Sequence, residues 1–488
     1  MVYNIFVREK IDKIISGRVG KYIDGFFNSP IYPYVVAAVC IFAHCVDLPV
    51  LGIFLLAVML SASFVFCNNT LVILPFALLC PFVMSENTMP DSGYYNTPFR
   101  IAALSITLAF SVAAFAFNLI YYGKWKLVFK KAYLTVSLSL MSGALVVGGL
   151  FSEDFCLNGV LQAVAIAVTL FLPYSMLVNC IEYKGKASVK YFANIAVAAA
   201  VTVGIYILRQ YCLHDFVTES AAVKQFLKLG AVGPNTGAAI ILIALPMTFY
   251  LIYVYKYGFL YYVLLVAEVF AMIMTYSRAA LIVAIPGTLI VSVLLCFKNK
   301  TGRLGYWITF GILISVALAL TVAYRDTVAK TVLSLFEEGS DSGRIDIWMT
   351  GFECWKRRPI FGVGLWFLRR HGYWFYSFHC TPLTYLFAGG LVGFAAYIYH
   401  RYKTVRLVFT AKLNSKRVFL ALAVLAMLLN ALLDLGMTDP LHLMYYSSML
   451  ALIESDARAT RDAAADMDKK DKQAAATPHE NQEVLINE

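Results

Sequence analysis

Long apolar segments separated by short polar ones make up most of the chain. A helix needs about 20 residues to cross the hydrocarbon core of a bilayer, and many of these segments approach that length. The pattern therefore predicts about 12–14 membrane-spanning helices and an all-α polytopic membrane fold. The predicted spans are 33–46, 49–66, 69–84, 101–121, 132–151, 159–181, 190–208, 236–255, 258–276, 279–297, 305–324, 381–400, 418–436 and 440–454.

Polar stretches interrupt this pattern at both termini and in two long loops. The N-terminal stretch repeats apolar residues among Lys and Arg, as an amphipathic helix at a membrane surface does. The C-terminal stretch is polar and poor in aromatic residues, which is typical of a disordered tail. The predicted organisation is an amphipathic segment at 1–30, spans over 31–324 with a long loop at 209–235, a second long loop with short amphipathic helices at 325–380, spans over 381–454, and a tail at 455–488.

Composition and charge support a membrane protein and orient it. Hydrophobic residues make up 60% of the chain and charged residues 14%, whereas soluble domains are about 25% charged. Basic residues concentrate in 124–131, 184–190, 298–303 and 400–417, on the loops that face the cytoplasm if the N-terminus does. We therefore expect both termini in the cytoplasm, both long loops outside, and an uncleaved first span. The net charge of +11 follows from this bias and predicts no nucleic-acid partner.

The strongest candidate for chemistry is the stretch 343–393, where aromatic, basic and histidine residues interrupt the apolar background. Apolar residues at helical spacing predict an amphipathic helix over 344–356. Arg344 falls in its first turn, where it can face a phosphate at the bilayer surface. The competing interpretation is an ordinary interfacial helix.

Two histidines belong to the same stretch. His379 directly precedes a predicted span, with Thr381 as its expected N-cap and Pro382 at the first helical position. A neutral imidazole held there suits a base that works near pH 7, although a structural role is the alternative. His371 is a second candidate in the aromatic loop. Asp434, near the last outer hairpin, can approach the site from another helix, as can Asp439.

Arg278 is the candidate farthest from this stretch, in the predicted outer hairpin TYSRAA. Its side chain either snorkels to lipid headgroups or clamps phosphate oxygens through two parallel hydrogen bonds. Glu268 is an acid in mid-span, which is a functional candidate by default. It precedes Arg278 by about 15 Å along a helix, so we expect it to be protonated or paired elsewhere.

The loop 209–235 adds a second group of polar residues. Several of its charged residues, among them Arg209, Lys224 and Lys228, can lie on one helix, whose default interpretation is a solvated face and whose alternative is contact with substrate. Asn235 stands at the start of the next span, where it is an expected N-cap.

The ten cysteines form no Cys-x-x-Cys pair and no zinc-ligand spacing. A disulfide between Cys354 and Cys380 remains an alternative to free thiols. Walker-type, GxGxxG and HExxH motifs are also missing, so the sequence predicts no cofactor and no metal. A site on the outer face excludes cytosolic nucleotide-sugars as donors, and we therefore expect a lipid-linked donor.

Several of these short motifs, in their order, resemble the O-antigen ligase and polysaccharide polymerase superfamily of bacterial membrane glycosyltransferases. The resemblance covers about 190–450 and rests on SRAA at 277–280, GRIDIW from Gly343, RPIFGVG at 358–364, and His379 followed by Leu383, Leu386, Gly390 and Gly393. PNTGA at 234–238 is a weaker match. Cys380 departs from the pattern, because the family usually has Asn beside the histidine.

The resemblance implies a GT-C-like enzyme in the bacterial cytoplasmic membrane that transfers or polymerises a glycan from a polyprenyl (undecaprenyl) pyrophosphate carrier, without metal and with inversion. Arg278 and Arg344 would bind the diphosphate, and His379 would position or deprotonate the acceptor hydroxyl. Further substrate contacts would come from Arg209, Lys224, Lys228, Asn235, His371 and Arg358. The implied partners are the donor, a glycan or lipid acceptor, the bilayer, and other polysaccharide-assembly proteins.

Two other classes of function remain open. A transporter or flippase of lipid-linked glycans would favour charged residues along the spans and helices broken at mid-membrane, whereas these spans are nearly free of charge. A non-catalytic membrane scaffold would make the outer Arg and His residues incidental. The choice between polymerase and ligase depends on the acceptor, which no residue identifies.

Overall fold

The computed structural model describes residues 2–85, 88, 94–152, 155–214, 227, 229, 232–298, 303–323, 325, 343–367, 378–434 and 438–476. Within these residues the fold consists of helices and contains no β-sheet. The helices are α1 (Val2–Ile15), α2 (Arg18–Phe27), α3 (Tyr32–Cys45), α4 (Pro49–Phe66), η1 (Thr70–Ile73), α5 (Leu74–Leu79), η2 (Cys80–Val83), η5 (Tyr94–Asn96), α6 (Pro98–Tyr121), α7 (Trp125–Val128), α8 (Thr135–Leu150), α9 (Leu157–Cys180), α10 (Lys186–Leu213), α12 (Pro234–Val254), η6 (Gly258–Tyr261), α13 (Tyr262–Met274), α14 (Arg278–Lys298), α15 (Arg303–Ala323), α17 (Arg344–Arg357), α19 (Thr381–Val408), α20 (Ser415–Asn430) and α21 (Pro440–Ala476).

Seven helices of the described residues are long and apolar enough to cross a membrane, namely α4, α6, α9, α10, α12, α14 and α19. The pair α2 and α3, bent by 72°, can supply an eighth span. Several other predicted spans form shorter apolar helices, among them α8 and the segment Thr70–Val83. That segment is broken because Pro75 and Pro81 each begin a new helix. The all-α membrane fold is thus confirmed, and the described part of the chain contains seven or eight full-length spans where the sequence pattern predicted 12–14 for the whole chain.

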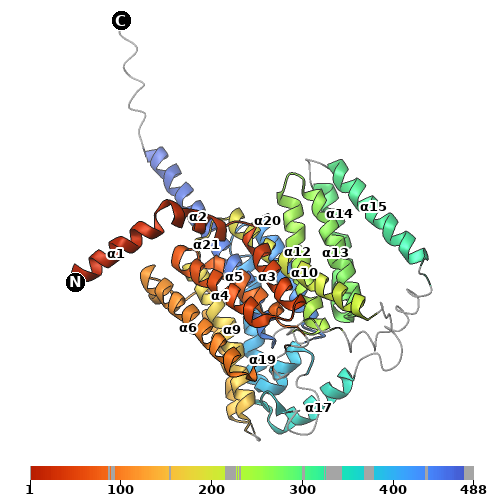
Figure 1. Cartoon of the computed structure of the whole chain (residues 1–488). Coiled ribbons are helices and arrows are strands. Elements are labelled where there is room, and N and C mark those ends of the chain that lie inside the picture. The colour runs from red at the N-terminus through yellow and green to blue at the C-terminus, as the bar shows by residue number, and fades with distance from the viewer. Residues whose placement is uncertain are drawn as a thin grey trace.

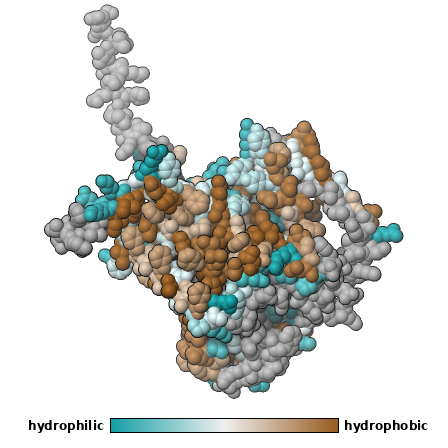
Figure 2. Space-filling view, viewed as in Figure 1, coloured by the Kyte–Doolittle hydropathy of each residue, from teal (hydrophilic) through white to brown (hydrophobic). Residues whose placement is uncertain are grey.

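Helices α10 and α12 pack together in the interior of the bundle (Figure 1). In their apolar windows 78% and 83% of residues are buried, compared with 17% in α6. Small residues at 196–200 of α10 let the helix axes approach closely. Apolar side chains of α6 such as Ile106 and Leu108 are exposed instead, and Figure 2 shows apolar residues across the middle of that face. This outer surface is suited to contact with lipid.

An ion pair buried between α20 and α21 fixes the bundle end that lies away from α17 (Figure 1). Asp456 accepts hydrogen bonds from Arg417 Nη2 at 2.8 Å and from Asn414 Nδ2 at 2.7 Å, and it lies 2.9 Å from Lys416 Nζ. The side chains of Arg417 and Asp456 are 0% and 1% exposed. A buried charge needs such a partner and such hydrogen bonds to remain ionised.

Helix α21 continues to Ala476, whereas the sequence predicted a disordered tail from residue 455. The extension is rich in alanine, the residue with the highest helix propensity. An ion pair four residues apart, between Lys472 and Asp468 at 2.7 Å, adds further support. These local interactions explain why the helix continues beyond the apolar part of α21.

Helix α19 is broken at Gly390, whose φ of 65° and ψ of −164° are not helical. The segment 359–364 lies across the break, and its backbone hydrogen-bonds groups on both sides of it. The carbonyls of Phe387 and Ala388 accept from Val363 and Gly364 at 2.9 and 3.1 Å, and the N–H groups of Leu391 and Val392 donate to Pro359 and Ile360 at 2.8 and 3.2 Å. Backbone polar groups within a membrane require such partners, so the segment RPIFGVG serves as the internal partner of a broken helix.

Candidate functional site

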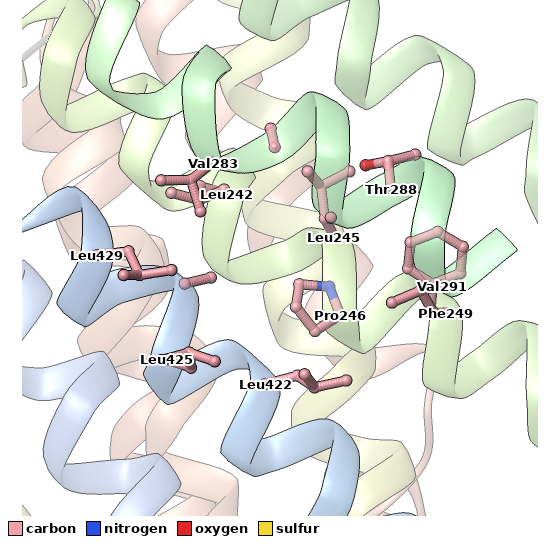
Figure 3. A pocket seen from close by; sticks show the side chains of 13 residues that line it. Leu242, Leu245, Pro246, Phe249, Val283, Thr288, Val291, Leu422, Leu425 and Leu429 are labelled. Atoms are coloured by element: carbon pink, nitrogen blue, oxygen red, sulfur yellow. The ribbon is translucent and has the colours of Figure 1, made fainter. Parts of the chain in front are cut away.

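Helices α12, α14 and α20 line one apolar groove, which shows how they run relative to one another (Figure 3). Val283 of α14 lies beside Leu242 of α12, and Val291 lies beside Phe249. The two helices are therefore parallel and begin at the same end of the bundle. Leu429, at the end of α20, lies toward Leu242 in the same groove. We call the end at which α12 and α14 begin and α20 ends the site end.

Backbone and side-chain contacts show that the ends of three further helices, α10, α19 and α21, also lie at the site end. The N–H of Thr381 donates to the carbonyl of Ala431 at 2.8 Å, so α19 begins beside the end of α20. Thr236 Oγ1 lies 3.5 Å from Asp439 Oδ2, so α21 begins beside the start of α12. The last turns of α10 lie there as well, because Val203 packs against Gly237.

Helix α17 begins at Arg344, as the sequence predicted, and packs on the start of α19. Ile347 forms a small apolar cluster with Phe378 and Phe387. Gly351 permits this close approach, because a Cβ at that position would lie 2.6 Å from the Phe387 ring. Arg344 is partly buried in the first turn, so its guanidinium extends from a helix that the bundle fixes.

His379 has an unusual backbone conformation, with a φ of 46°. Left-handed backbone is unfavourable for residues other than glycine, and it persists where neighbouring contacts enforce it. One such contact is the indole N–H of Trp348, which donates to the Phe378 carbonyl at 2.7 Å. The N-cap of α19 is Cys380 and not Thr381. Thr381 is instead the first helical residue, because its N–H is already bonded to the end of α20.

The imidazole of His379 faces the carboxylate of Asp434. Its Nδ1 lies 3.6 Å from Asp434 Oδ1, and the two side chains are 30% and 7% exposed. At this distance the two groups are close, but they are not hydrogen-bonded, and Nδ1 has no hydrogen-bond partner within the described residues. An imidazole beside a carboxylate is an arrangement that a general base can use.

Arg278 is the first residue of α14 and is partly buried. The turn before it is tight: Tyr276 has a φ of 53°, and the N–H of Ser277 donates to Thr275 Oγ1 at 3.2 Å. Because α14 begins at the site end, Arg278 lies at the same end of the bundle as His379, but on a different helix.

The groove between α12, α14 and α20 runs along the middle of α12 and α14 and has a cavity volume of about 130 Å³. Its lining is apolar apart from Thr288, with Pro246 and Leu425 facing each other across it (Figure 3). Such a lining favours an apolar chain over a polar ligand. The hydrophobic pattern did not predict this groove.

The structure places two other predicted site residues at the site end. Asn235 is the second residue of α12, and the N-cap is Gly233, so the expected capping role is wrong. Pro234 explains the difference, because proline favours the first helical position. Arg209 lies in the last turns of α10 and interacts electrostatically with His44.

Arg358 directly follows α17 and is exposed, and its carbonyl accepts a hydrogen bond from the Gly362 N–H at 2.9 Å. Its backbone thus helps to form the segment that crosses the break in α19. Lys224, Lys228 and His371 lie outside the described residues.

Glu268 is paired inside the bundle, as expected. Thr248 Oγ1 lies 2.8 and 2.9 Å from its two carboxylate oxygens. Cys354 and Cys380 are both buried free thiols, so the alternative of a disulfide is wrong. The described residues contain no group of three His, Cys, Asp or Glu side chains that could hold a metal ion.

Comparison with known families identifies the segment that contains most of this site. Residues 260–398 match the family model described as O-antigen ligase. This segment of the chain is similar to the O-antigen ligase family. No curated protein matches the chain. The matched segment includes Arg278, Arg344, His379 and the break at Gly390, whereas Asp434 lies beyond it. The resemblance noted from the motifs is thereby confirmed.

Proposed function

We propose that this membrane protein is a metal-independent, inverting glycosyltransferase that uses a glycan on a polyprenyl pyrophosphate carrier. The observation that supports this most is the His379–Asp434 pair, in which a base and a positioning carboxylate lie 3.6 Å apart at the site end. The similarity to the O-antigen ligase family supports the same class of reaction.

In the proposed reaction, the acceptor hydroxyl gives its proton to His379 as its oxygen attacks the anomeric carbon. The bond between that carbon and the diphosphate oxygen breaks, and the electron pair leaves with the polyprenyl diphosphate. Arg278 and Arg344 stabilise the negative charge that develops on the diphosphate. Asp434 orients the imidazole and stabilises it once protonated.

The apolar groove supports a lipid-linked donor. Its lining on α14 starts at Val283, five residues after Arg278, and it lies between α12, α14 and α20. An isoprenoid chain lying in it would extend from a diphosphate at Arg278 into the bilayer. The donor would then be held by apolar contacts at one end and by charge at the other.

We further propose that the site end faces outward from the bacterial cytoplasmic membrane and that both termini are cytoplasmic. The basic residues at 124–131, 184–190, 298–303 and 400–417 support this orientation. Reporter fusions at positions 300 and 360 should report opposite sides of the membrane. The same side for both would contradict the proposed orientation.

A flippase is the competing function, and the break in α19 is the feature that favours it, because transporters often bind substrate at broken helices. Here, however, backbone groups of segment 359–364 occupy the break. A Cβ at Gly390 would lie 2.2 Å from the Ile360 carbonyl oxygen. This packing leaves no room for a substrate at the break.

The deciding experiment is reconstitution with a polyprenyl-pyrophosphate oligosaccharide and candidate acceptors. Longer glycans on the carrier would indicate a polymerase, and transfer to a lipid acceptor would indicate a ligase. We expect His379→Ala and Arg344→Ala to abolish product formation. Lys356→Ala is the matched control, since Lys356 lies at the far end of α17 and pairs with Glu353 at the surface. Full activity in the first two variants would contradict the assignment of the site.

A further inference from the structure

Helix α17 contributes more to the site end than its first residue. Arg344 and Trp348 are four residues apart, so their side chains lie on the same side of the helix, one turn from each other. Trp348 is partly buried and packs against the cluster of Ile347, Phe378 and Phe387. The same face of α17 thus carries a cation and an indole, and the indole contacts the backbone just before α19.

The indole N–H acts on the peptide group that precedes His379. The Phe378 carbonyl, which accepts from Trp348 Nε1 at 2.7 Å, shares a rigid plane with the N–H of His379. Fixing the direction of this carbonyl restricts the rotation about the next backbone bond, which is φ of His379. That φ is 46°, a value that a non-glycine residue keeps only when contacts enforce it.

The other contacts of His379 come from a different part of the molecule. On the C-terminal side, the N–H of Thr381 donates to the carbonyl of Ala431, just after the end of α20. The imidazole faces Asp434, which lies in the turn that follows α20. These contacts belong to the bundle. The contact through Trp348 comes from α17, which precedes α19 in the chain and also carries Arg344.

We propose that Trp348 is a positioning residue that couples the diphosphate site on α17 to the imidazole of His379. An anionic group bound at Arg344 holds α17 against α19, and the indole N–H then keeps the His379 backbone in its left-handed conformation. Binding of the donor therefore completes the geometry of the base. This inference rests on the proposed function and adds a coupling between its donor and acceptor halves.

The test compares Trp348→Phe with Trp355→Phe in the full chain, reconstituted in vesicles. Both changes remove one indole N–H from α17 and keep an aromatic ring. Trp355 Nε1 donates to the Pro359 carbonyl at 3.2 Å, which also accepts from the Leu391 N–H. In the control, Trp355→Phe, the Pro359 carbonyl keeps the Leu391 N–H as a hydrogen-bond donor. Trp348→Phe instead removes the indole hydrogen bond to the Phe378 carbonyl, next to His379.

We expect Trp348→Phe to lower kcat about tenfold, the value of one buried hydrogen bond. Trp355→Phe should retain kcat. Equal losses in both variants, or a loss in Trp348→Phe that appears only in the donor KM, would overturn the proposal.

A second readout does not depend on catalysis. The ¹⁵N resonances of the His379 ring, assigned by their loss in His379→Ala, should change in Trp348→Phe and not in Trp355→Phe. They should also change when inorganic pyrophosphate is added, and this response should be lost in Trp348→Phe. An inactive wild-type chain whose resonances follow this pattern would refute the glycosyltransferase function and keep the coupling. If the His379 resonances change neither in Trp348→Phe nor on addition of pyrophosphate, the coupling is refuted, whether or not the protein transfers glycans.

Discussion

Asp434→Asn is the substitution that most sharply tests how His379 works. It keeps the shape of the side chain and removes the charge that lies 3.6 Å from Nδ1 of the imidazole. At that separation and an effective dielectric constant of about 20, Coulomb's law gives roughly 4–5 kcal/mol between a carboxylate and an imidazole that has taken up the acceptor's proton in the transition state. Because 30% of the His379 side chain is exposed, solvent reduces this to about 2 kcal/mol.

A loss of about 2 kcal/mol in the transition state corresponds to a roughly 30-fold fall in kcat/KM. The assay is steady-state glycan transfer by the reconstituted protein, with the amount of folded protein checked by its thermal transition. Asp439→Asn is a matched control: Asp439 Oδ1 also lies 3.6 Å from a histidine Nδ1, that of His442. A kcat/KM within threefold of wild type in Asp434→Asn, together with an inactive His379→Ala, would refute the role given to the carboxylate.

Three further predictions address the diphosphate, the broken helix and the far end of the bundle. Arg344→Lys keeps the charge but loses the two-pronged hydrogen bonding, so the donor KM should rise about tenfold; an unchanged KM would argue against diphosphate binding there. Gly390→Ala should lower the unfolding free energy by more than about 3 kcal/mol, because its Cβ would meet backbone, whereas Gly143→Ala has open space and should be neutral in the same thermal assay. Asp456→Asn should cost about 3 kcal/mol at pH 7 by leaving Arg417 unpaired. Burial raises the pKa of Asp456, but the hydrogen bonds from Lys416, Tyr183 and Asn414 and the Lys416 charge outweigh it and lower that pKa. This contribution is therefore complete above the pKa of the unfolded carboxyl, about 4, and is lost as pH falls through the folded value; a melting temperature that responds to acid equally in wild type and Asp456→Asn would contradict it.

Local patterns in the sequence predicted the helical class and several placements at the site. The apolar segments and the amphipathic pattern after Gly343 depend on nearest-neighbour periodicity, so α17 begins at Arg344 as predicted. The position of His379 just before α19 follows from the apolar segment that begins there. These features need no knowledge of what packs against them.

Features that depend on distant partners were not predictable in the same way. Threonine is a residue type that favours the N-cap position, so Thr381 was the expected N-cap of α19. Its N–H instead donates to the carbonyl of Ala431, fifty residues later, and Cys380 is the N-cap. The glycines of RPIFGVG and of α19 were recognised as a motif in the sequence. Their shared role, to let segment 359–364 approach the break in α19 closely, requires knowing that the two segments pack together. The pairing of His379 with Asp434 likewise requires the end of α20 to meet the start of α19.

The central claim is that the chain breaks the bond between a glycan and a polyprenyl diphosphate. The most direct measurement is a single-turnover reaction that quantifies released polyprenyl diphosphate and new glycosidic bonds in the same sample. The proposal predicts one diphosphate released for each bond formed in the wild type, and neither product in His379→Ala. A donor that crosses the vesicle membrane intact, with no diphosphate released at any acceptor concentration, would contradict it.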